Sequence, residues 1–444
     1  MITAPICEFV RRYRYSGALR MHMPGHKGTA LLGPEPFDLT EIEGADVLYH
    51  AEGIIRESEA NAAALFGTKK TVYSAEGSSL CIRAMLYLAL LHARANHKKP
   101  VIAAGRNAHK VFMTAAALLD LDIRWIYGTE SVISCAITPA QLEDVIVSEN
   151  PAAVYITSPD YLGNIADIKS LSTVCKKHGV LLLVDNAHGA YLHFLPEPMH
   201  PMQLGADICC DSAHKTLPVL TGGAYLHIAH GTPDMFAQRA ESAMALFAST
   251  SPSYLILQSL DAMNPLLATS FPAQLKACAE RLDTLKAKLR AHGYALCGEE
   301  RTKLCLLPKS FGYTGTALAE ILTHHNIYCE FSDADHLVMM FTPETTPADF
   351  ARLERALLSV LPAPAILSKP PVPPHAERVL SPREALFSPS ETLPLSECEN
   401  RILADANVSC PPAVPLAVCG ERLTPEVISA MEYYGTEHCT VVVE

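Results

Sequence analysis

The stretch "DICCDSAHKTLPVLTGGAYLHI" (207–228) holds two short apolar runs on either side of a histidine–lysine pair. Lys215 comes directly after His214 at the exit of the first run, in surroundings whose composition indicates burial. A lysine is almost never fully buried unless another group pairs with it. Two interpretations of Lys215 are therefore open, an ordinary half-exposed lysine and an amine that is used chemically.

Short apolar runs of the same kind recur through the first half of the chain, separated by longer amphipathic segments. Runs rich in Val, Ile and Leu are typical of a mostly parallel sheet that is covered on both faces. The sequence therefore predicts an α/β fold, in which ligands bind beyond the carboxyl ends of the strands. The predicted strands are 100–104, 123–127, 152–157, 179–185, 206–211 and 222–228.

The length of the chain predicts more than one domain, because 444 residues exceed the roughly 100–200 residues of a usual domain. A helix is expected over 273–293, a strand over 336–342 and a second helix over 348–361, which together indicate a smaller α/β domain. The six prolines of 362–375 are typical of a stiff linker. The expected division is an N-terminal segment (1–40), a large domain (41–265), the smaller α/β domain (266–361), the Pro-rich linker (362–375) and a small C-terminal domain (376–444).

Composition excludes several classes of protein. Hydrophobic residues make up 49% of the chain and charged residues 18%, which is incompatible with general disorder. No apolar stretch has the length of a membrane span and the N-terminus lacks a signal-peptide core, so a cytoplasmic protein is expected. The net charge of −12 argues against a nucleic-acid partner and is compatible with a cationic substrate. The fourteen cysteines contain no C-x-x-C pair, and reduced thiols and no metal site are expected.

Asp185 ends one of the predicted strands, and three interpretations apply to a carboxylate in that place. A magnesium site beside a nucleotide would need a phosphate-binding G-x-x-x-x-G-K-[ST] motif, which the chain lacks. A zinc site with His188 would need further ligands at metal spacing. The third interpretation, a partner for the pyridine nitrogen of pyridoxal 5'-phosphate, also explains Lys215, because an aspartate and an imine-forming lysine mark enzymes that use this cofactor.

A bound pyridoxal phosphate needs an anion-binding site for its phosphate and a side chain that stacks on its ring. Gly77, Ser78 and Ser79 open a strongly apolar helical segment, where backbone N–H groups, hydroxyls and the helix dipole favour an anion, although a plain helix cap is the alternative. Ser212 and His214, which flank the lysine, could add donors. His109 follows another predicted strand and could stack on the ring, although a lone histidine is more often structural.

Seven motifs occur along the chain: "MHMPGHKG" (21–28), "AEGSS" (75–79), "RNAHK" (106–110), "SPDYLGNIAD" (158–167), "VDNAHGAY" (184–191), "SAHKTLP" (212–218) and "STSPSYLILQSLD" (249–261). They stand in the order found in the Orn/Lys/Arg decarboxylases, and the chain resembles that family over nearly its whole length. The family consists of pyridoxal phosphate enzymes with the aspartate aminotransferase fold. The likeness continues through 381–428, which is similar to the family's C-terminal domain.

The resemblance implies a role for each candidate residue. Lys215 would be the Schiff-base lysine, Asp185 the partner of the pyridine nitrogen, His109 the stacking residue, and His188 a neighbour of the ring. The phosphate would be held by Gly77, Ser78, Ser79, Ser212 and His214. The resemblance also implies a homodimer, and a short form without the receiver-like N-terminal domain of longer members.

The implied reaction is decarboxylation of lysine, arginine or ornithine, which releases CO₂ and a di- or polyamine precursor. A proton from Lys215 or a nearby histidine would complete it, and Glu421 or Asp46 could bind the substrate's side-chain cation unless both are surface carboxylates. Because the same lysine and aspartate serve other reactions, an aminotransferase, another lyase and a non-catalytic cofactor-binding relative stay open. Three departures from the family pattern leave the preferred amino acid undecided: Asn186 stands for the usual glutamate, Ser78 for a threonine and Val111 for a common serine.

Overall fold

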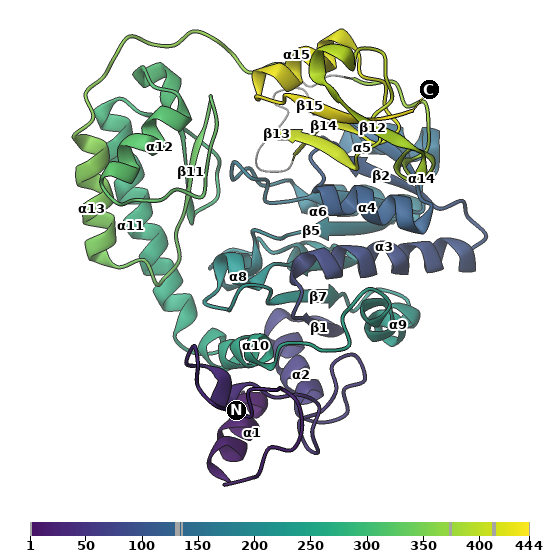
Figure 1. The fold of residues 1–444 in the computed structure, drawn as a ribbon, viewed down its shortest axis with the longest axis vertical. Coiled ribbons are helices and arrows are strands. Elements are labelled where there is room, and N and C mark those ends of the chain that lie inside the picture. The colour runs from purple at the N-terminus through teal and green to yellow at the C-terminus, as the bar shows by residue number, and fades with distance from the viewer. Residues whose placement is uncertain (1, 129–133, 135, 373–374, 411–413, 444) are drawn as a thin grey trace. The chain divides into compact units, whose positions relative to one another are not determined.

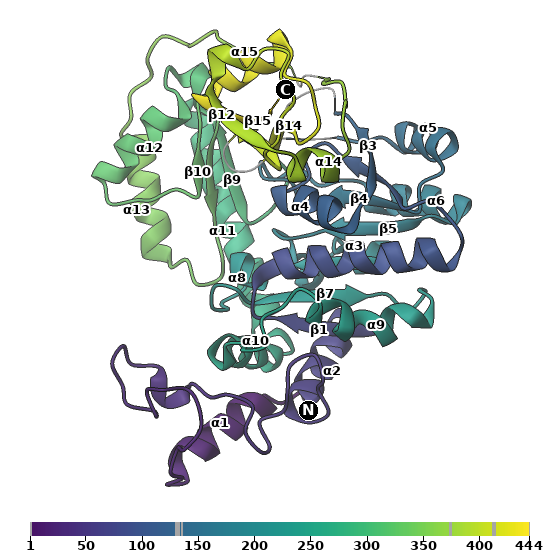
Figure 2. The ribbon, with the colours of Figure 1, turned by 45° about the vertical axis from the view of Figure 1, so that its right-hand side comes forward.

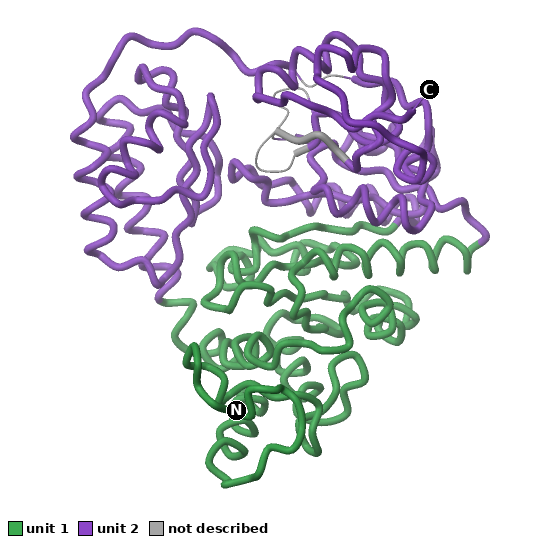
Figure 3. The backbone as a smooth tube through the Cα atoms, in the orientation of Figure 1, with its two compact units in different colours: residues 1–96, 181–273 green, residues 97–180, 274–444 purple. Residues whose placement is uncertain are grey.

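The computed structural model describes residues 2–128, 134, 136–372, 375–410 and 414–443. Within them the chain forms two compact units, each assembled from separate stretches of sequence (Figure 3). Unit 1 comprises residues 1–96 and 181–273, and unit 2 comprises residues 97–180 and 274–444. The division into five parts predicted from sequence stays a prediction, and residues 373 and 374 of the predicted linker lie outside the described residues.

A mostly parallel sheet with the strand order β1-β7-β6-β5-β4-β2-β3 confirms the predicted α/β fold (Figure 1). Each of the six predicted runs overlaps one strand. The strand β1 was not predicted, and it pairs antiparallel with β7, which in turn pairs antiparallel with β6. The strands are β1 (Lys70–Ser74), β2 (Val101–Gly105), β3 (Asp122–Ile126), β4 (Ala153–Thr157), β5 (Leu181–Asp185), β6 (Ile208–Asp211) and β7 (Ala224–Ile228).

Unit 1 surrounds its strands with helices, as Figure 2 shows for α3, which lies along β7. The helix α3 is apolar through most of its length and packs on β5, β6 and β7, so the core lies between this helix and the sheet. The helices α2 and α10 pack on β1. The helical elements of unit 1 are α1 (Pro5–Tyr15), η1 (Glu35–Phe37), α2 (Ile54–Phe66), α3 (Gly77–Ala95), η2 (Ala190–Phe194), α7 (Pro201–Leu204), α8 (Ala213–Thr216), α9 (Asp234–Ala245) and α10 (Tyr254–Leu267).

Unit 2 contains a second sheet of four strands in the order β10-β11-β9-β8. Leu282 and Leu289 of α11 and Leu353 of α13 belong to one buried cluster with this sheet, as their helical spacing predicts. The helices α4 (Lys110–Leu119), α5 (Pro139–Glu149) and α6 (Ile168–His178) also belong to this unit. The elements of the second sheet region are α11 (Phe271–His292), β8 (Ala295–Cys297), β9 (Lys303–Leu307), η3 (Pro308–Phe311), α12 (Gly315–His324), β10 (Phe331–Ser332), β11 (Leu337–Met340) and α13 (Pro347–Leu358).

The C-terminal part of unit 2 forms two two-stranded sheets, β12-β15 and β13-β14. Leu403, Val427 and Met431 lie in a buried cluster of this region. Among the described residues, none of the helices is both long enough and apolar enough to cross a membrane. The elements are α14 (Pro382–Phe387), β12 (Ser390–Pro394), η4 (Leu395–Glu397), β13 (Asn407–Cys410), β14 (Val414–Val418), α15 (Pro425–Tyr433) and β15 (His438–Val442).

Candidate active site

Two carboxylates end two neighbouring parallel strands of unit 1, Asp185 on β5 and Asp211 on β6. The register places Asp185 opposite Cys210, so both carboxylates lie at the carboxyl edge of the sheet. The Asp185 side chain is buried, and its Oδ1 accepts hydrogen bonds from the Ala187 N–H at 3.2 Å and the Cys210 thiol at 3.6 Å. The sequence pattern therefore located Asp185 where a sheet of this kind binds ligands.

Lys215 lies on the single turn α8, directly after β6, and its amine reaches the turn that follows β5. Its Nζ lies 3.1 Å from Nε2 of His188, which is buried. An ammonium group only donates hydrogen bonds, so a charged Lys215 requires an unprotonated Nε2 on His188. This contact brings together two residues that are 27 positions apart and that the sequence assigned to one site.

A group of hydroxyls and backbone amides lies at the start of α3. Ser212 Oγ donates to Ser78 Oγ at 2.7 Å, which joins the end of β6 to this helix terminus. Gly77 adopts φ +72° and a Cβ there would meet open space, so the backbone is accessible at this point. The Gly77 N–H donates to Gly222 O at 2.7 Å, in contrast to the free N–H expected from sequence. The amides of Ser78 and Ser79 have no partner within the helix, as at any helix N-terminus.

His214 lies between Ser212 and Lys215. Its Nδ1 lies 3.1 Å from Gly223 O and donates to that carbonyl, since a carbonyl oxygen only accepts. Burial lowers the pKa of His214, although the hydrogen bond to Gly223 opposes the shift. With Nδ1 donating to Gly223, the ring can donate to a phosphate only through Nε2, and only when both ring nitrogens carry a proton.

These residues of unit 1 fit pyridoxal phosphate by the chemistry of their donor and acceptor groups. Lys215 offers an amine, Asp185 offers a buried carboxylate for a protonated ring nitrogen, and the start of α3 offers hydroxyls and amides for a phosphate. Together the three features match the amine, ring and phosphate requirements of this one cofactor.

His109 lies in unit 2, where it is the N-cap of α4. Its Nδ1 accepts a hydrogen bond from the Val111 N–H at 3.3 Å, which explains the local role of the "RNAHK" motif as a helix start. The predicted stacking on a cofactor ring stays a prediction.

The two carboxylates considered for a substrate cation both have partners inside their own unit. Glu421 is 1% exposed and its Oε2 accepts from Arg106 Nη2 at 2.7 Å, so it is not the surface carboxylate that was the alternative. Asp46 accepts hydrogen bonds from the backbone N–H groups of Val47, Glu52, Gly53 and Ile55. Burial opposes ionisation of Asp46, but these amides lower its pKa overall. Both carboxylates therefore have structural partners already.

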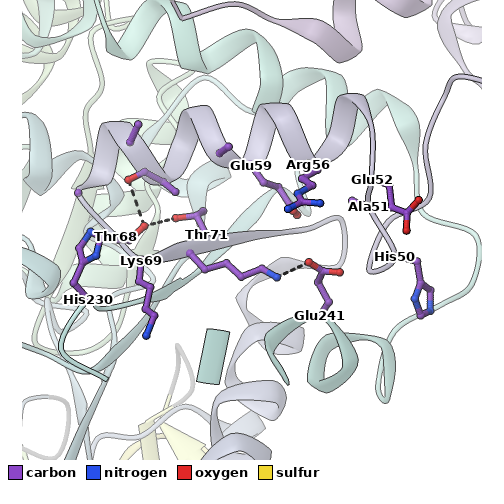
Figure 4. Close-up of a pocket in the computed structure, with 15 residues that line it drawn as sticks. His50, Ala51, Glu52, Arg56, Glu59, Thr68, Lys69, Thr71, His230 and Glu241 are labelled. Atoms are coloured by element: carbon purple, nitrogen blue, oxygen red, sulfur yellow. Dashed lines mark hydrogen bonds and ion pairs between the residues drawn. The ribbon is translucent and has the colours of Figure 1, made fainter. Parts of the chain in front are cut away.

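A cavity of about 900 Å³ opens elsewhere in unit 1, beside α2 and the start of β1 (Figure 4). Lys70 Nζ pairs with Glu241 Oε1 at 2.5 Å, and both residues line the cavity. Burial raises the pKa of Glu59, another lining residue, to about 8, although the Tyr73 N–H donates to it. None of the predicted site residues lines this cavity, so it is separate from the group around Lys215.

The sequence interpretation missed the residues that surround Asp211. His200, His227 and Asn186 all contact its carboxylate and are fully buried. Asn186 was noted only as a departure, and the two histidines carry no motif. The available signal was Asp211 itself, an acid at the end of an apolar strand and one residue before Ser212.

The mostly parallel sheet, with a buried aspartate and a lysine after adjacent strands, has the α/β fold of fold type I enzymes, which bind ligands at the carboxyl edge of the sheet. The sequence matches the Orn/Lys/Arg decarboxylase major domain over residues 4–303. The chain belongs to this Orn/Lys/Arg decarboxylase family.

Relatives and solved structures agree with this assignment. The chain is 31% identical to the arginine decarboxylase of Bacillus subtilis, over 96% of this chain and 92% of that protein. It is 28% identical to the arginine decarboxylase of Halalkalibacterium halodurans, over 95% and 91% of the two chains. The lysine decarboxylase of Francisella novicida has the same fold, with a TM-score of 0.80 at 16% identity, over 100% of this chain and 81% of that one. The constitutive lysine decarboxylase of E. coli gives a TM-score of 0.78 at 16% identity, over 100% and 82%.

Proposed function

We propose that this protein is a pyridoxal phosphate-dependent decarboxylase of a basic amino acid. The observation that carries the proposal is the grouping, in one unit, of Lys215, His188 and Asp185 beside the hydroxyls of Ser78 and Ser212. Membership of the Orn/Lys/Arg decarboxylase family supports the choice of reaction, because the same lysine and aspartate also serve transamination.

The proposal gives each residue a part in holding the cofactor. Lys215 would hold it through its amine, Asp185 would pair with its ring nitrogen, and Ser78, Ser79, Ser212 and His214 would hold its phosphate beside Gly77. His109 is proposed to stack on the ring. When bound, pyridoxal phosphate supplies an electron sink for the pair left on Cα as CO₂ departs.

The residues of the chain supply the proton chemistry. His188 Nε2 lies 3.1 Å from Lys215 Nζ, so an unprotonated Nε2 could take a proton from that amine and leave it neutral and nucleophilic. The same proton, held at Lys215 Nζ or His188 Nε2, is then available for Cα of the product. The buried Asp185 would pair with a protonated ring nitrogen through a charge-assisted hydrogen bond.

The substrate is proposed to be arginine, lysine or ornithine. The relatives named arginine decarboxylases favour arginine. Incubation of the purified protein with each amino acid and pyridoxal phosphate, followed by measurement of released CO₂ and of the amine product, tests the proposal. Release of CO₂ from at least one of them supports it, whereas amine transfer without CO₂ would identify an aminotransferase and no turnover a non-catalytic relative.

A homodimer in the cytoplasm completes the proposal. The segment 15–32 exposes six large apolar side chains, which a second copy of the chain could cover. These are Tyr15, Leu19, Met21, Met23, Leu31 and Leu32, each 68–91% exposed. The twelve cysteines whose side chains the structure describes carry free thiols, which suits a reducing compartment.

A further inference from the structure

Asp211 is a buried carboxylate at the end of β6 with four side-chain donors directed at it, one of which is the Cys209 thiol at 3.5 Å from its Oδ1. His200 Nε2 lies 2.9 Å and His227 Nε2 3.2 Å from its Oδ2, and Asn186 Nδ2 donates to its Oδ1 at 2.7 Å. The carboxylate and all four donor side chains are 0% exposed. A carboxylate removed from water in this way stays ionised only where donors replace the lost hydration.

Both histidines can supply these hydrogen bonds as neutral rings. His200 Nδ1 accepts from the Met202 N–H at 3.2 Å, which places the proton of a neutral ring on Nε2. His227 Nδ1 lies 2.9 Å from Thr71 Oγ1, whose hydroxyl can donate to it. Hydrogen bonds therefore account for this His–Asp–His contact without a metal ion, although Cys209 also lies close enough to join such a cluster.

Asn186 ties this carboxylate to the turn that carries His188. Its backbone N–H donates to Cys210 O at 2.9 Å, and its carbonyl accepts from the Gly189 N–H at 2.8 Å. A Cβ at Gly189 would lie 2.0 Å from Asn186 Oδ1, so a glycine is needed for the amide to lie over this turn. The Asn186 side chain thus connects the β5 end and the His188 turn with the strand that leads to Lys215.

We propose that Asn186 and Asp211 act as a positioning pair that sets the approach of His188 to Lys215, with the donor at 186 and the carboxylate at 211. The inference rests on the proposed function, since it assigns a role toward the same amine. An acid at 186 would place two carboxylates against each other in a dry site, where both cannot ionise at ordinary pH. Asn186, which departs from the glutamate of the family pattern, is therefore the residue that Asp211 requires.

A reciprocal exchange tests the pairing. In Asn186→Asp, two carboxylates face each other. Adding Asp211→Asn restores one donor and one acceptor with their positions exchanged. The amide nitrogen introduced at position 211 can donate to the carboxylate introduced at position 186. The amide oxygen at position 211 can still accept from both histidines. The affinity of each purified variant for pyridoxal 5'-phosphate is measured from its absorbance band, with the fraction of Lys215 modified after borohydride as the second readout.

We expect Asn186→Asp to weaken cofactor binding about tenfold or more, and the double variant to return to within about threefold of the wild type. Asn264→Asp is the matched control, since Asn264 is equally buried in the same unit and donates to Ser58 and to Tyr73. It should lower the melting temperature but leave the cofactor affinity of the folded protein unchanged, and Asp211→Asn should not rescue it.

A double variant no better than Asn186→Asp, or an Asn186→Asp protein that binds like the wild type, would overturn the pairing. A wild-type protein that forms no band and no Lys215 adduct would instead overturn the proposed function. The two failures are therefore distinguishable in one experiment.

Discussion

At the scale of single residues, Asp185 is the carboxylate proposed to pair with the ring nitrogen of the cofactor. Its carboxylate is buried at the end of β5, so replacing it with an amide removes the charge without changing the shape. Asp185→Asn is expected to lower kcat/KM for CO₂ release by about 100-fold or more, the usual effect of losing one preorganised charge contact. Asp234→Asn is the control, because this side chain is 81% exposed, and a loss of equal size there would contradict the assignment.

Glu59 gives a prediction for stability against pH. Burial raises its pKa from 4.5 to about 8, so the folded protein holds a proton that the unfolded chain has lost. The protonated Glu59 side chain therefore contributes to the free energy of unfolding. This contribution is fully present below the unfolded pKa of 4.5 and is lost as the pH rises through the folded pKa of about 8. Glu59→Gln keeps an acceptor for the Tyr73 N–H and has no charge to bury.

Thermal unfolding of the two proteins tests this interpretation of Glu59. The free energy of unfolding of Glu59→Gln, relative to that of the wild type, should rise by about 2–4 kcal/mol between about pH 5 and about pH 9. If the difference in unfolding free energy between the two proteins does not change with pH over this range, Glu59 ionises with an ordinary pKa.

Residues with distinctive chemistry could be predicted from the sequence, and residues defined only by contact could not. Lys215 and Asp185 follow apolar runs, which is a local signal. The contacts of Asn186 with Asp211 depend on the pairing of β5 and β6, and no local pattern encodes the partner of a buried amide. The surface alternative for Glu421 was wrong because its partner Arg106 is 315 positions away along the chain.

At the scale of elements, the start of α3 has a backbone that only glycine adopts easily. Gly77 at φ +72° and Gly67 at φ +62° are matched positions, since an added Cβ meets open space at both. Alanine at either position should cost about 1 kcal/mol of stability through backbone strain. Gly77→Ala should also weaken pyridoxal phosphate binding about tenfold by shifting the helix terminus, whereas Gly67→Ala should not.

Denaturant unfolding and a cofactor titration of the two glycine variants separate strain from binding. Equal affinities for the cofactor would mean that the α3 terminus is only a structural turn.

Six strands of the main sheet were predicted because each is a short apolar run between helix-length segments. The strand β1 (Lys70–Ser74) was missed because "KTVYS" is short and half polar, and its place at the edge of the sheet depends on antiparallel pairing with β7. Hydrophobic periodicity indicates that a segment is extended, but it does not specify which strand it pairs with.

At the scale of the whole molecule, the exposed apolar side chains of segment 15–32 predict self-association. Leu31 and Leu32 are 80% and 91% exposed, so charges there should not disturb the fold of the single chain. Leu31→Glu with Leu32→Glu is expected to weaken a dimer about 100-fold or more, because burying two unpaired charges is costly. Sedimentation over a range of concentrations measures this, and a wild-type protein that stays monomeric would contradict the proposed dimer.

The proposal that Lys215 binds pyridoxal 5'-phosphate covalently is tested most directly by locating the lysine to which the cofactor is attached. Purified protein is incubated with pyridoxal 5'-phosphate, reduced with borohydride and digested, and the modified peptide is identified by mass spectrometry. We expect one pyridoxyl group per chain, on Lys215, and no pyridoxyl group in the Lys215→Ala variant. A reduced adduct on any other lysine, or none in the wild type, would contradict it.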